Sequence, residues 1–179
     1  DKRIKIWEPN SAKLMQTLRG HQQGVMSVDW SPDGRQLATS SWDQAVKIWD
    51  PFSGKSLQTL KGHKNQVWCV AWSPDGTRLA TGGSGMTVKV LEAASGNLLQ
   101  ALEGHTRGVS QVAWNSKGNR LATSSWDKTV KVWDPEKGTL VQTLQGHLSS
   151  VNCVAWDPEG TRLATSGSDL TIRIWSMSE

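Results

Sequence analysis

The chain alternates short apolar runs with turn sequences, and no stretch has the three-to-four-residue spacing of apolar positions that marks a helix. In "VAWSPDGTRLAT", residues 70–81, a Pro-Asp-Gly turn separates two runs rich in residues that favour strands. The surrounding unit predicts four strands, at Val67–Trp72, Arg78–Gly82, Thr87–Leu91 and Leu98–Leu102. Such a unit is an antiparallel meander, so the pattern predicts an all-β fold.

This unit repeats at a fixed interval. The dipeptide Gly-His recurs every 42 residues, ending at His21, His63, His105 and His147. Positions occupied by Trp, Gly and Leu recur at the same interval, without any insertion. A period of this length indicates an array or a propeller, in which each repeat is one supersecondary unit.

Two stretches, "GHKNQVWCVAWSPDGTRLATG" and "SSWDKTVKVWD", carry a resemblance to a known family. Gly-His at the start of a unit, Ser-x-Asp before its third strand and Trp-Asp at the end of that strand make the chain similar to the WD-repeat family of β-propellers. The resemblance covers essentially the whole chain and implies four-stranded antiparallel blades. It places four WD repeats at residues 21–62, 63–104, 105–146 and 147–179. Residues 1–20 would then form the third and outer strands of a shared blade, and repeat 4 would lack its own outer strand.

The resemblance also implies a buried hydrogen-bonded tetrad of His, a hydroxyl residue, Asp and Trp within a blade. By position, its members are His21, Ser41, Asp43 and Trp49; His105, Ser125, Asp127 and Trp133; and His147, Asp169 and Trp175, with Gly167 replacing the hydroxyl. The second unit keeps His63 but has Gly83, Gly85 and Leu91 at the other three positions. A buried imidazole and carboxylate are unfavourable without partners, so we expect the tetrads to be structural.

Ser, His and Asp are also the residue types of a hydrolase triad. A triad needs one accessible nucleophile beside an oxyanion site, whereas these residues recur in several units without a Gly-x-Ser-x-Gly motif. One His per blade cannot converge on a metal ion at ligand distances of about 2.0 Å. The Gly-rich stretch 82–85 lacks the Lys and helix of a phosphate loop. We therefore expect no enzymatic activity, no metal and no cofactor.

Composition narrows the range of partners. The net charge is +4 and the pI about 9.2, but Lys and Arg are scattered, which argues against nucleic acid as a partner. The apolar runs are too short to cross a membrane. Cys69 and Cys153 lie in apolar runs without a CxxC motif, which predicts buried, reduced thiols. With no secretory signal in the sequence, we expect a cytoplasmic location.

The resemblance implies a partner-binding face formed by the loop after Gly-His and the turn before the third strand. Its expected members are Trp42, Trp68, Trp126, Gln66, Ser84, Ser168, Ser110 and Asn152. The chain has 11 Trp, one Phe and no Tyr, and these three Trp lie outside the periodic Trp positions. They are candidate interface anchors. The alternative is that Trp42 and Trp126 simply cover small residues of neighbouring blades.

Three functions remain open at this stage. The first is a rigid scaffold that presents this face to a protein or peptide. The second is binding of a glycan or small ligand, with sugar rings stacked on Trp42 and Trp126. The third is an assembly module without a native ligand, as an engineered or amplified half-propeller would be.

Four repeats are few for a closed propeller, because family rings usually hold seven or eight blades. Two chains would supply eight, so we expect a homodimer that closes an eight-bladed ring. Each chain predicts seventeen strands, and two chains bring thirty-four where eight four-stranded blades use thirty-two. One third-type strand per chain, Arg3–Trp7 or Thr171–Trp175, would then be displaced. A natural fragment, an engineered half-ring and a piece of a longer chain all fit this count.

Overall fold

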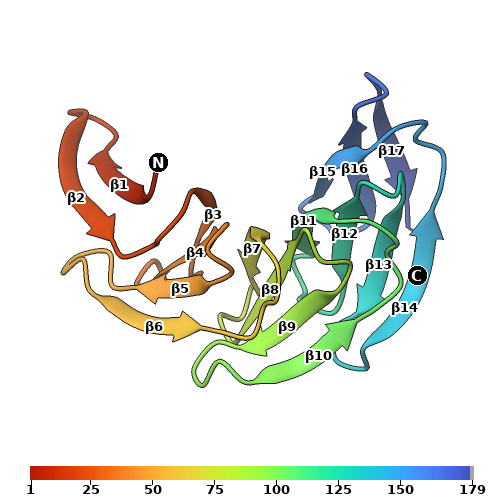
Figure 1. The fold of residues 1–179 in the computed structure, drawn as a ribbon. Coiled ribbons are helices and arrows are strands. Elements are labelled where there is room, and N and C mark those ends of the chain that lie inside the picture. The colour runs from red at the N-terminus through yellow and green to blue at the C-terminus, as the bar shows by residue number, and fades with distance from the viewer. Residues whose placement is uncertain (178–179) are drawn as a thin grey trace.

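The structure, a computed structural model, describes residues 1–177. These residues form seventeen strands and no helix, in five separate antiparallel sheets that follow one another along an open arc (Figure 1). Three sheets have four strands, as the sequence predicts for a blade, and the order of strands within each sheet follows the chain. The prediction of an all-β chain with four-stranded antiparallel, propeller-like blades is confirmed.

The first sheet is a hairpin of β1 (Arg3–Glu8) and β2 (Lys13–Arg19). Blade 1 contains β3 (Val25–Trp30), β4 (Leu37–Ser41), β5 (Val46–Trp49) and β6 (Ser56–Leu60). Blade 2 contains β7 (Val67–Trp72), β8 (Arg78–Gly83), β9 (Val88–Glu92) and β10 (Leu98–Leu102). Blade 3 contains β11 (Val109–Trp114), β12 (Leu121–Ser125), β13 (Val130–Asp134) and β14 (Thr139–Leu144). Blade 4 contains β15 (Val151–Trp156), β16 (Arg162–Gly167) and β17 (Ile172–Ser176).

The turns between the first two strands of each blade explain why the chain reverses there. In blade 1 the amide of Gly34 donates to the carbonyl of Ser31 at 2.8 Å, and Gly34 has a φ of 69°. That left-handed conformation favours glycine over residues with a side chain. Its equivalents Gly76, Gly118 and Gly160 have φ values of 71°, 70° and 71°. The periodic Gly positions of the sequence are therefore turn positions.

The hydrophobic core lies between successive blades. The first strands β3, β7, β11 and β15 line the inner side of the arc, and the last strands β6, β10 and β14 lie on its outer side (Figure 1). Val46 and Ile48 on β5 belong to the same buried cluster as Val67, Val70 and Trp72 on β7. Two further clusters join blade 2 to blade 3 and blade 3 to blade 4 in the same way. Each blade thus depends on its neighbour to bury its apolar side chains.

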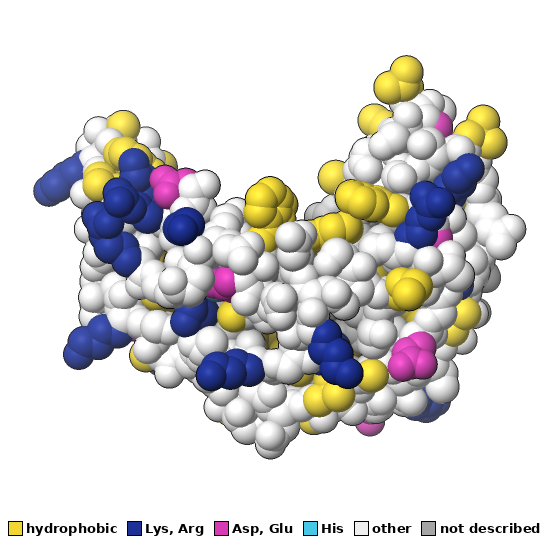
Figure 2. Space-filling view, viewed as in Figure 1, with side chains coloured by type: hydrophobic (Ala, Val, Ile, Leu, Met, Phe, Trp, Pro, Cys, Tyr) yellow, Lys and Arg dark blue, Asp and Glu magenta, His cyan; other side chains and the backbone are white. Residues whose placement is uncertain are grey.

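Both ends of the arc leave apolar side chains uncovered, and the space-filling view shows apolar side chains at the tips of both arms (Figure 2). On β17, Ile172 is 77% exposed and Ile174 is 65% exposed, whereas their equivalents one repeat earlier, Val130 and Val132, are fully buried. At the other end, Val28 and Trp30 on β3 are 50% and 45% exposed. Their equivalents on β7, Val70 and Trp72, are buried.

One cysteine prediction was wrong for the same reason. Cys69 is a buried free thiol, as expected, because blade 3 covers it. Cys153, its equivalent in blade 4, is a free but exposed thiol. None of the described residues follows blade 4 to cover that face.

Candidate functional site

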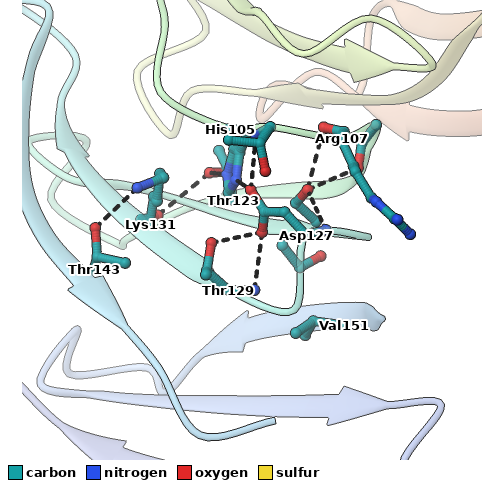
Figure 3. A network of polar contacts seen from close by, with 12 residues as sticks. His105, Arg107, Thr123, Asp127, Thr129, Lys131, Thr143 and Val151 are labelled. Carbon is teal, nitrogen blue, oxygen red and sulfur yellow. Dashed lines mark hydrogen bonds and ion pairs between the residues drawn. The ribbon is translucent and has the colours of Figure 1, made fainter. Parts of the chain in front are cut away.

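A hydrogen-bonded network lies at one end of blade 3 (Figure 3). Nδ1 of His105 is 2.7 Å from a carboxylate oxygen of Asp127, and Nε2 is 2.7 Å from the hydroxyl of Thr123. The indole of Trp133 donates to the same hydroxyl at 2.9 Å. Because the carboxylate of Asp127 can only accept, the proton of His105 lies on Nδ1, and Nε2 accepts from the hydroxyl of Thr123. The network therefore favours one neutral tautomer of the histidine.

Asp127 also holds the loop and the turn on either side of it. One carboxylate oxygen accepts from the amide of Thr106 at 3.1 Å. The other accepts from the amide and the hydroxyl of Thr129 at 2.9 Å and 2.6 Å. The carboxylate thus ties the loop after Gly-His to the turn before the third strand.

Blades 1 and 4 repeat this geometry. In blade 1, His21 lies 2.8 Å from Asp43 and 2.8 Å from Thr39, and Trp49 donates to Thr39 at 2.8 Å. In blade 4, the corresponding distances are 2.8 Å from His147 to Asp169, 2.9 Å from His147 to Thr165 and 2.9 Å from Trp175 to Thr165. In these blades, the structure brings together the predicted His, Asp and Trp.

The predicted hydroxyl members, Ser41 and Ser125, were wrong. Ser125 is the last residue of β12, and its hydroxyl donates to the carbonyl of Gly108 at 2.9 Å and accepts from the amide of Asp127 at 3.0 Å. Ser41 occupies the same place in blade 1 and accepts from the amide of Asp43. Because these serines lie two residues further along the strand than the threonine, they bond to the turn backbone and not to the histidine.

The fourth network therefore has its hydroxyl after all, from Thr165, and Gly167 replaces only the turn serine. A sequence signal for the threonines existed. Threonine recurs at 39, 81, 123 and 165 in all four units, whereas the position two residues later changes between Ser and Gly.

Blade 2 retains only part of the network. Nε2 of His63 is 3.0 Å from the hydroxyl of Thr81, so this unit keeps two members where the sequence predicted one. Gly85 supplies no carboxylate, and the buried side chain of Leu91 replaces the indole. Nδ1 of His63 has no hydrogen-bond partner within residues 1–177.

Burial and hydrogen bonding set the protonation of these groups. Burial lowers the pKa of His21, and the carboxylate of Asp43 opposes that effect only in part. Burial alone would raise the pKa of Asp127, but hydrogen bonds from His105 and Thr129 outweigh it and hold the pKa well below its usual range. Without a carboxylate partner, burial followed by the positive charge of Lys89 lowers the pKa of His63 to about 4.

These networks stabilise loops but offer no catalytic arrangement. Ser125 is fully buried, and its hydroxyl bonds to backbone atoms and not to His105. In the part of the chain that the structure describes, no three His, Cys, Asp or Glu side chains gather closely enough to hold a metal ion. The same residues contain no helix long and apolar enough to cross a membrane.

Two of the predicted face tryptophans stack across the seam between blades 2 and 3. The ring centroids of Trp68 and Trp126 are 4.5 Å apart, with the ring planes tilted by 37°. Trp68 also covers Gly108, where a Cβ would lie only 2.7 Å from the indole. Trp42 is exposed in blade 1, with its indole 3.6 Å from the Cβ position of Gly24. Packing over small residues therefore explains part of the tryptophan pattern.

The polar members of the predicted face differ in their surroundings. Gln66 and Ser84 are exposed, and exposed Asn152 donates to Ser168 at 3.0 Å. Ser110 was predicted to be exposed on this face, and the structure differs. Ser110 is half-buried, and its hydroxyl donates to the carbonyl of Val151 in blade 4 at 2.6 Å.

Comparison with known proteins agrees with this geometry. The sequence model of the family described as WD domain, G-beta repeat, matches residues 12–50, 54–91, 96–134 and 138–176. The chain belongs to the WD-repeat family. Each match spans about one period, so this WD-repeat chain contains four copies of the family unit.

Similar curated proteins share single repeats with this WD-repeat chain. A guanine nucleotide-binding protein subunit beta of Schizosaccharomyces pombe is 39% identical over 44 residues, which cover 25% of the chain and 14% of that protein. Coronin-7 of Rattus norvegicus is 46% identical over 39 residues, 22% of the chain and 4% of that protein. Ribosome assembly protein 4 of Saccharomyces cerevisiae is 44% identical over 39 residues, 22% of the chain and 8% of that protein. The matched segment is thus a small part of each relative.

Proposed function

We propose that this chain is a non-enzymatic WD-repeat scaffold that closes an eight-bladed ring with a second copy of itself and presents the ring face to a protein or peptide. The observation that carries the proposal is the exposure of core-type side chains at both ends of the arc. Ile172 and Ile174 are exposed at one end, and Val28 and Trp30 at the other. Where a neighbouring blade is present, the equivalents of the two isoleucines and of Val28 are buried, and the equivalents of Trp30 are buried or half-buried.

The two ends are chemically matched. β1 carries "IKIW" and β17 carries "IRIW", and the two sequences lie 168 residues apart, which is four repeat periods. Ile4 and Ile6 on β1 already pack against Leu37 and Trp49 of blade 1. A surface of blade 1 that accepts β1 therefore has the shape and polarity to accept β17 of a second chain. This supports a copy of the same chain as the partner.

Ring closure also accounts for an incomplete blade. Blade 4 has three strands, and its last strand β17 leaves a free edge within the described residues. In the proposed dimer, β2 of one chain adds as the outer strand of blade 4 of the other, and β1 is the strand that is displaced. The two seams are then equivalent and related by a two-fold axis, and neither chain keeps an exposed strand edge.

The test is the oligomeric state of the 179-residue chain, measured by light scattering coupled to size exclusion. We expect a dimer at micromolar concentration, with a melting temperature that rises with protein concentration. Ile174→Glu should give a folded monomer because a charge would be buried at the seam. Val141→Glu is the matched control, because Val141 is a half-exposed residue on an outer strand and should leave the dimer intact.

A stable wild-type monomer would contradict ring closure, and a trimer or larger ring would contradict the blade count. The partner face needs a separate test, in which a pull-down with the chain is compared with one using the Trp42→Ala/Trp126→Ala double variant. Loss of a protein band supports the scaffold. Loss of a glycan-array signal would instead support sugar binding, for which exposed Trp42 is the better candidate because Trp126 already stacks on Trp68.

The similar proteins support a role for the scaffold in larger assemblies. Similar proteins include a subunit of a guanine nucleotide-binding protein and a ribosome assembly protein, and both names refer to proteins that act in larger assemblies. We infer the same kind of role for this chain. The free thiols of Cys69 and Cys153 support a reducing compartment, and we place the protein in the cytoplasm on that basis.

A further inference from the structure

Three blades of this chain hold an aspartate carboxylate of their own at one place, and blade 2 has the equivalent histidine, loop and turn without the carboxylate. In blade 1, Asp43 accepts from Nδ1 of His21 and from the amides of Gln22 and Ala45, at 2.8, 2.8 and 3.1 Å. Blades 3 and 4 repeat these contacts with Asp127 and Asp169. The site is therefore a set of three donors arranged around one carboxylate.

The same three donors exist in blade 2. By the repeat period, they are Nδ1 of His63 and the amides of Lys64 and Thr87, with Gly85 at the position of the aspartate. Within residues 1–177, none of these three donors has a hydrogen-bond partner, and the first two strands keep their pairing through Val67 and Gly83. The turn itself is more open than in the other blades, because Met86 has neither the left-handed φ nor the turn hydrogen bond of its equivalent Lys128. His63 and Thr87 are half-buried and Lys64 is exposed, and unpaired donors that point to one place favour an acceptor, above all an anionic one.

A cavity opens on these donors. It has a volume of about 620 Å³ and is lined by His63, Lys64, Gly85, Thr87, Lys89 and Glu103, among others. The missing aspartate side chain is not the only change that clears it. Leu91 replaces the indole found in the other blades, and Ala101 replaces the threonine that engages the equivalent lysine in blades 1 and 3.

That second replacement frees a positive charge. In blades 1 and 3, Lys47 and Lys131 donate to Thr59 and Thr143 on the outer strand. Lys89 has no such threonine and instead donates to the carbonyl of Gly62 at the rim of the cavity. Burial, and then the neighbouring charge of Lys64, lowers the pKa of Lys89, as expected for an ammonium group that lacks an anionic partner.

We propose that the blade 2 cavity binds a carboxylate group from another molecule, which takes the place that aspartate occupies in the other three blades. The carboxylate accepts from His63 and from the amides of Lys64 and Thr87, and Lys89 supplies the balancing charge. The chemical class is a small carboxylate or the carboxylate of an Asp, a Glu or a chain terminus. The cavity opens beside Gln66 and Ser84, on the proposed partner face. The inference does not depend on how the ring closes.

The test is a titration of the ¹⁵N-labelled chain with acetate and with N-acetyl-aspartate amide, followed by nuclear magnetic resonance. We expect saturable shifts of the His63 ring nitrogens and of the Lys64 and Thr87 amides, with His105 and His147 unchanged as internal controls. N-acetyl-asparagine amide is the matched neutral probe and should produce no saturable shift. Equal affinity for acetate and the aspartate amide assigns the site to small carboxylates, and tighter binding of the amide assigns it to a polypeptide.

Gly85→Asp should abolish the shifts, because the new carboxylate occupies the donors. The variant is sterically allowed, since Gly85 does not have a left-handed φ and a Cβ there meets only the flexible side chain of Asn65, at 3.3 Å. Ser168→Asp adds the same charge to the same turn of blade 4 and should leave binding unchanged. Lys89→Met should weaken binding about tenfold through the loss of one charged contact.

Glu103→Gln sharpens the test further. Glu103 is the single carboxylate among the described residues that line the cavity, and it forms no ion pair with Lys64 or Lys89 within 4 Å. Removing its charge should tighten acetate binding. The proposal is wrong if the wild-type chain shows no saturable shift up to high millimolar acetate, or if Gly85→Asp shows the same shifts as the wild type.

Discussion

Blade 2 and blade 3 have the same strand pairing but different polar interiors, and the turn before the third strand differs, because Lys128 has a left-handed φ and its equivalent Met86 does not. In both, the first two strands pair with the same irregularity near the loop, between Val67 and Cys69 in one and between Val109 and Gln111 in the other. Blade 3 has the full network around His105, whereas blade 2 has only His63 and Thr81. Strand pairing and packing between blades are therefore sufficient for the fold, and the network adds stability to one end of the blade.

The incomplete network belongs to an internal blade. Blade 2 lies between two blades with complete networks, and its inward side chains are buried against both neighbours. Val88 and Val90 are fully buried, as Val130 and Val132 of blade 3 are. Both faces of an internal blade are covered, so packing can compensate for lost polar contacts. Blade 4 leaves Ile172 and Ile174 exposed and has less packing for this compensation.

We expect the largest difference between the two blades when the histidine of each network is replaced. His105→Ala leaves the buried carboxylate of Asp127 and the hydroxyl of Thr123 without their partner, and we expect a loss of about 3 kcal/mol in the free energy of unfolding. His63→Ala removes a single hydroxyl contact and should lose about 1 kcal/mol. Urea unfolding at neutral pH measures both. Equal losses would mean that the two networks are energetically alike.

Next in size is Trp133→Leu, which gives blade 3 the residue found at position 91 of blade 2. Trp133 is fully buried and donates to Thr123, so we expect a loss of about 2 kcal/mol from the smaller side chain and the lost indole hydrogen bond. Combined with His105→Ala, the total loss should be smaller than the sum by about 1 kcal/mol, because both variants disrupt one network. Additive losses would show that the indole acts by packing alone.

The protonation of His63 predicts a pH effect that originates in blade 2 and adds to a smaller effect of the same sign from His21 in blade 1. Its pKa in the folded chain is about 4, against about 6.5 in an unfolded chain, so the unfolded state takes up a proton first as the pH falls. Stability is therefore full above pH 6.5 and decreases towards pH 4, by about 1–2 kcal/mol after allowance for the partly exposed ring. Thermal unfolding at several pH values should show this slope in the wild type, and His63→Gln should reduce it, whereas the contribution of His21 remains.

Gly85→Asp should have the smallest effect, and in the opposite direction. The new carboxylate can accept from His63 and from the amides of Lys64 and Thr87, as Asp127 does in blade 3. We expect a gain of about 1 kcal/mol, measured by urea unfolding. Because the carboxylate stabilises the protonated imidazole, the variant should also lose part of the pH slope seen in the wild type. A destabilised variant would mean that the donors of blade 2 are not aligned for a carboxylate.

Much of the fold could be predicted from the sequence because it is periodic. Turn residues such as Gly76 recur with strand-forming runs on both sides, so the strands of blade 2 lie within one or two residues of their predicted bounds. The central hydroxyl of the network was missed because Ser41 and Thr39 both lie on β4. The structure decides between them by placing Thr39 within reach of Trp49, and the recurrence of threonine at that position in all four units was the sequence signal for it.

Contacts between blades were harder to predict than contacts within a blade. The stacking of Trp68 on Trp126 and the inward turn of Ser110 depend on the rotation between successive sheets, which no local pattern encodes. The exposure of Cys153 depends on whether a further blade covers β17, and its sequence surroundings are nearly those of buried Cys69. For the tryptophan pair, Gly108 was the available sequence signal, because a position without a side chain lets the indole of Trp68 pack closely on it.

The Trp68–Trp126 pair gives the molecule a built-in optical signal. Two indoles held 4.5 Å apart and tilted by 37° couple their electronic transitions, which splits a band in the circular dichroism spectrum. A difference spectrum against Trp126→Phe isolates that band from the remaining tryptophans. Because one ring belongs to blade 2 and the other to blade 3, the band disappears when the seam separates, even where both sheets persist. Its melting curve, compared with that of the strand signal, distinguishes an array that unfolds as one unit from one that first parts beside its weakest blade.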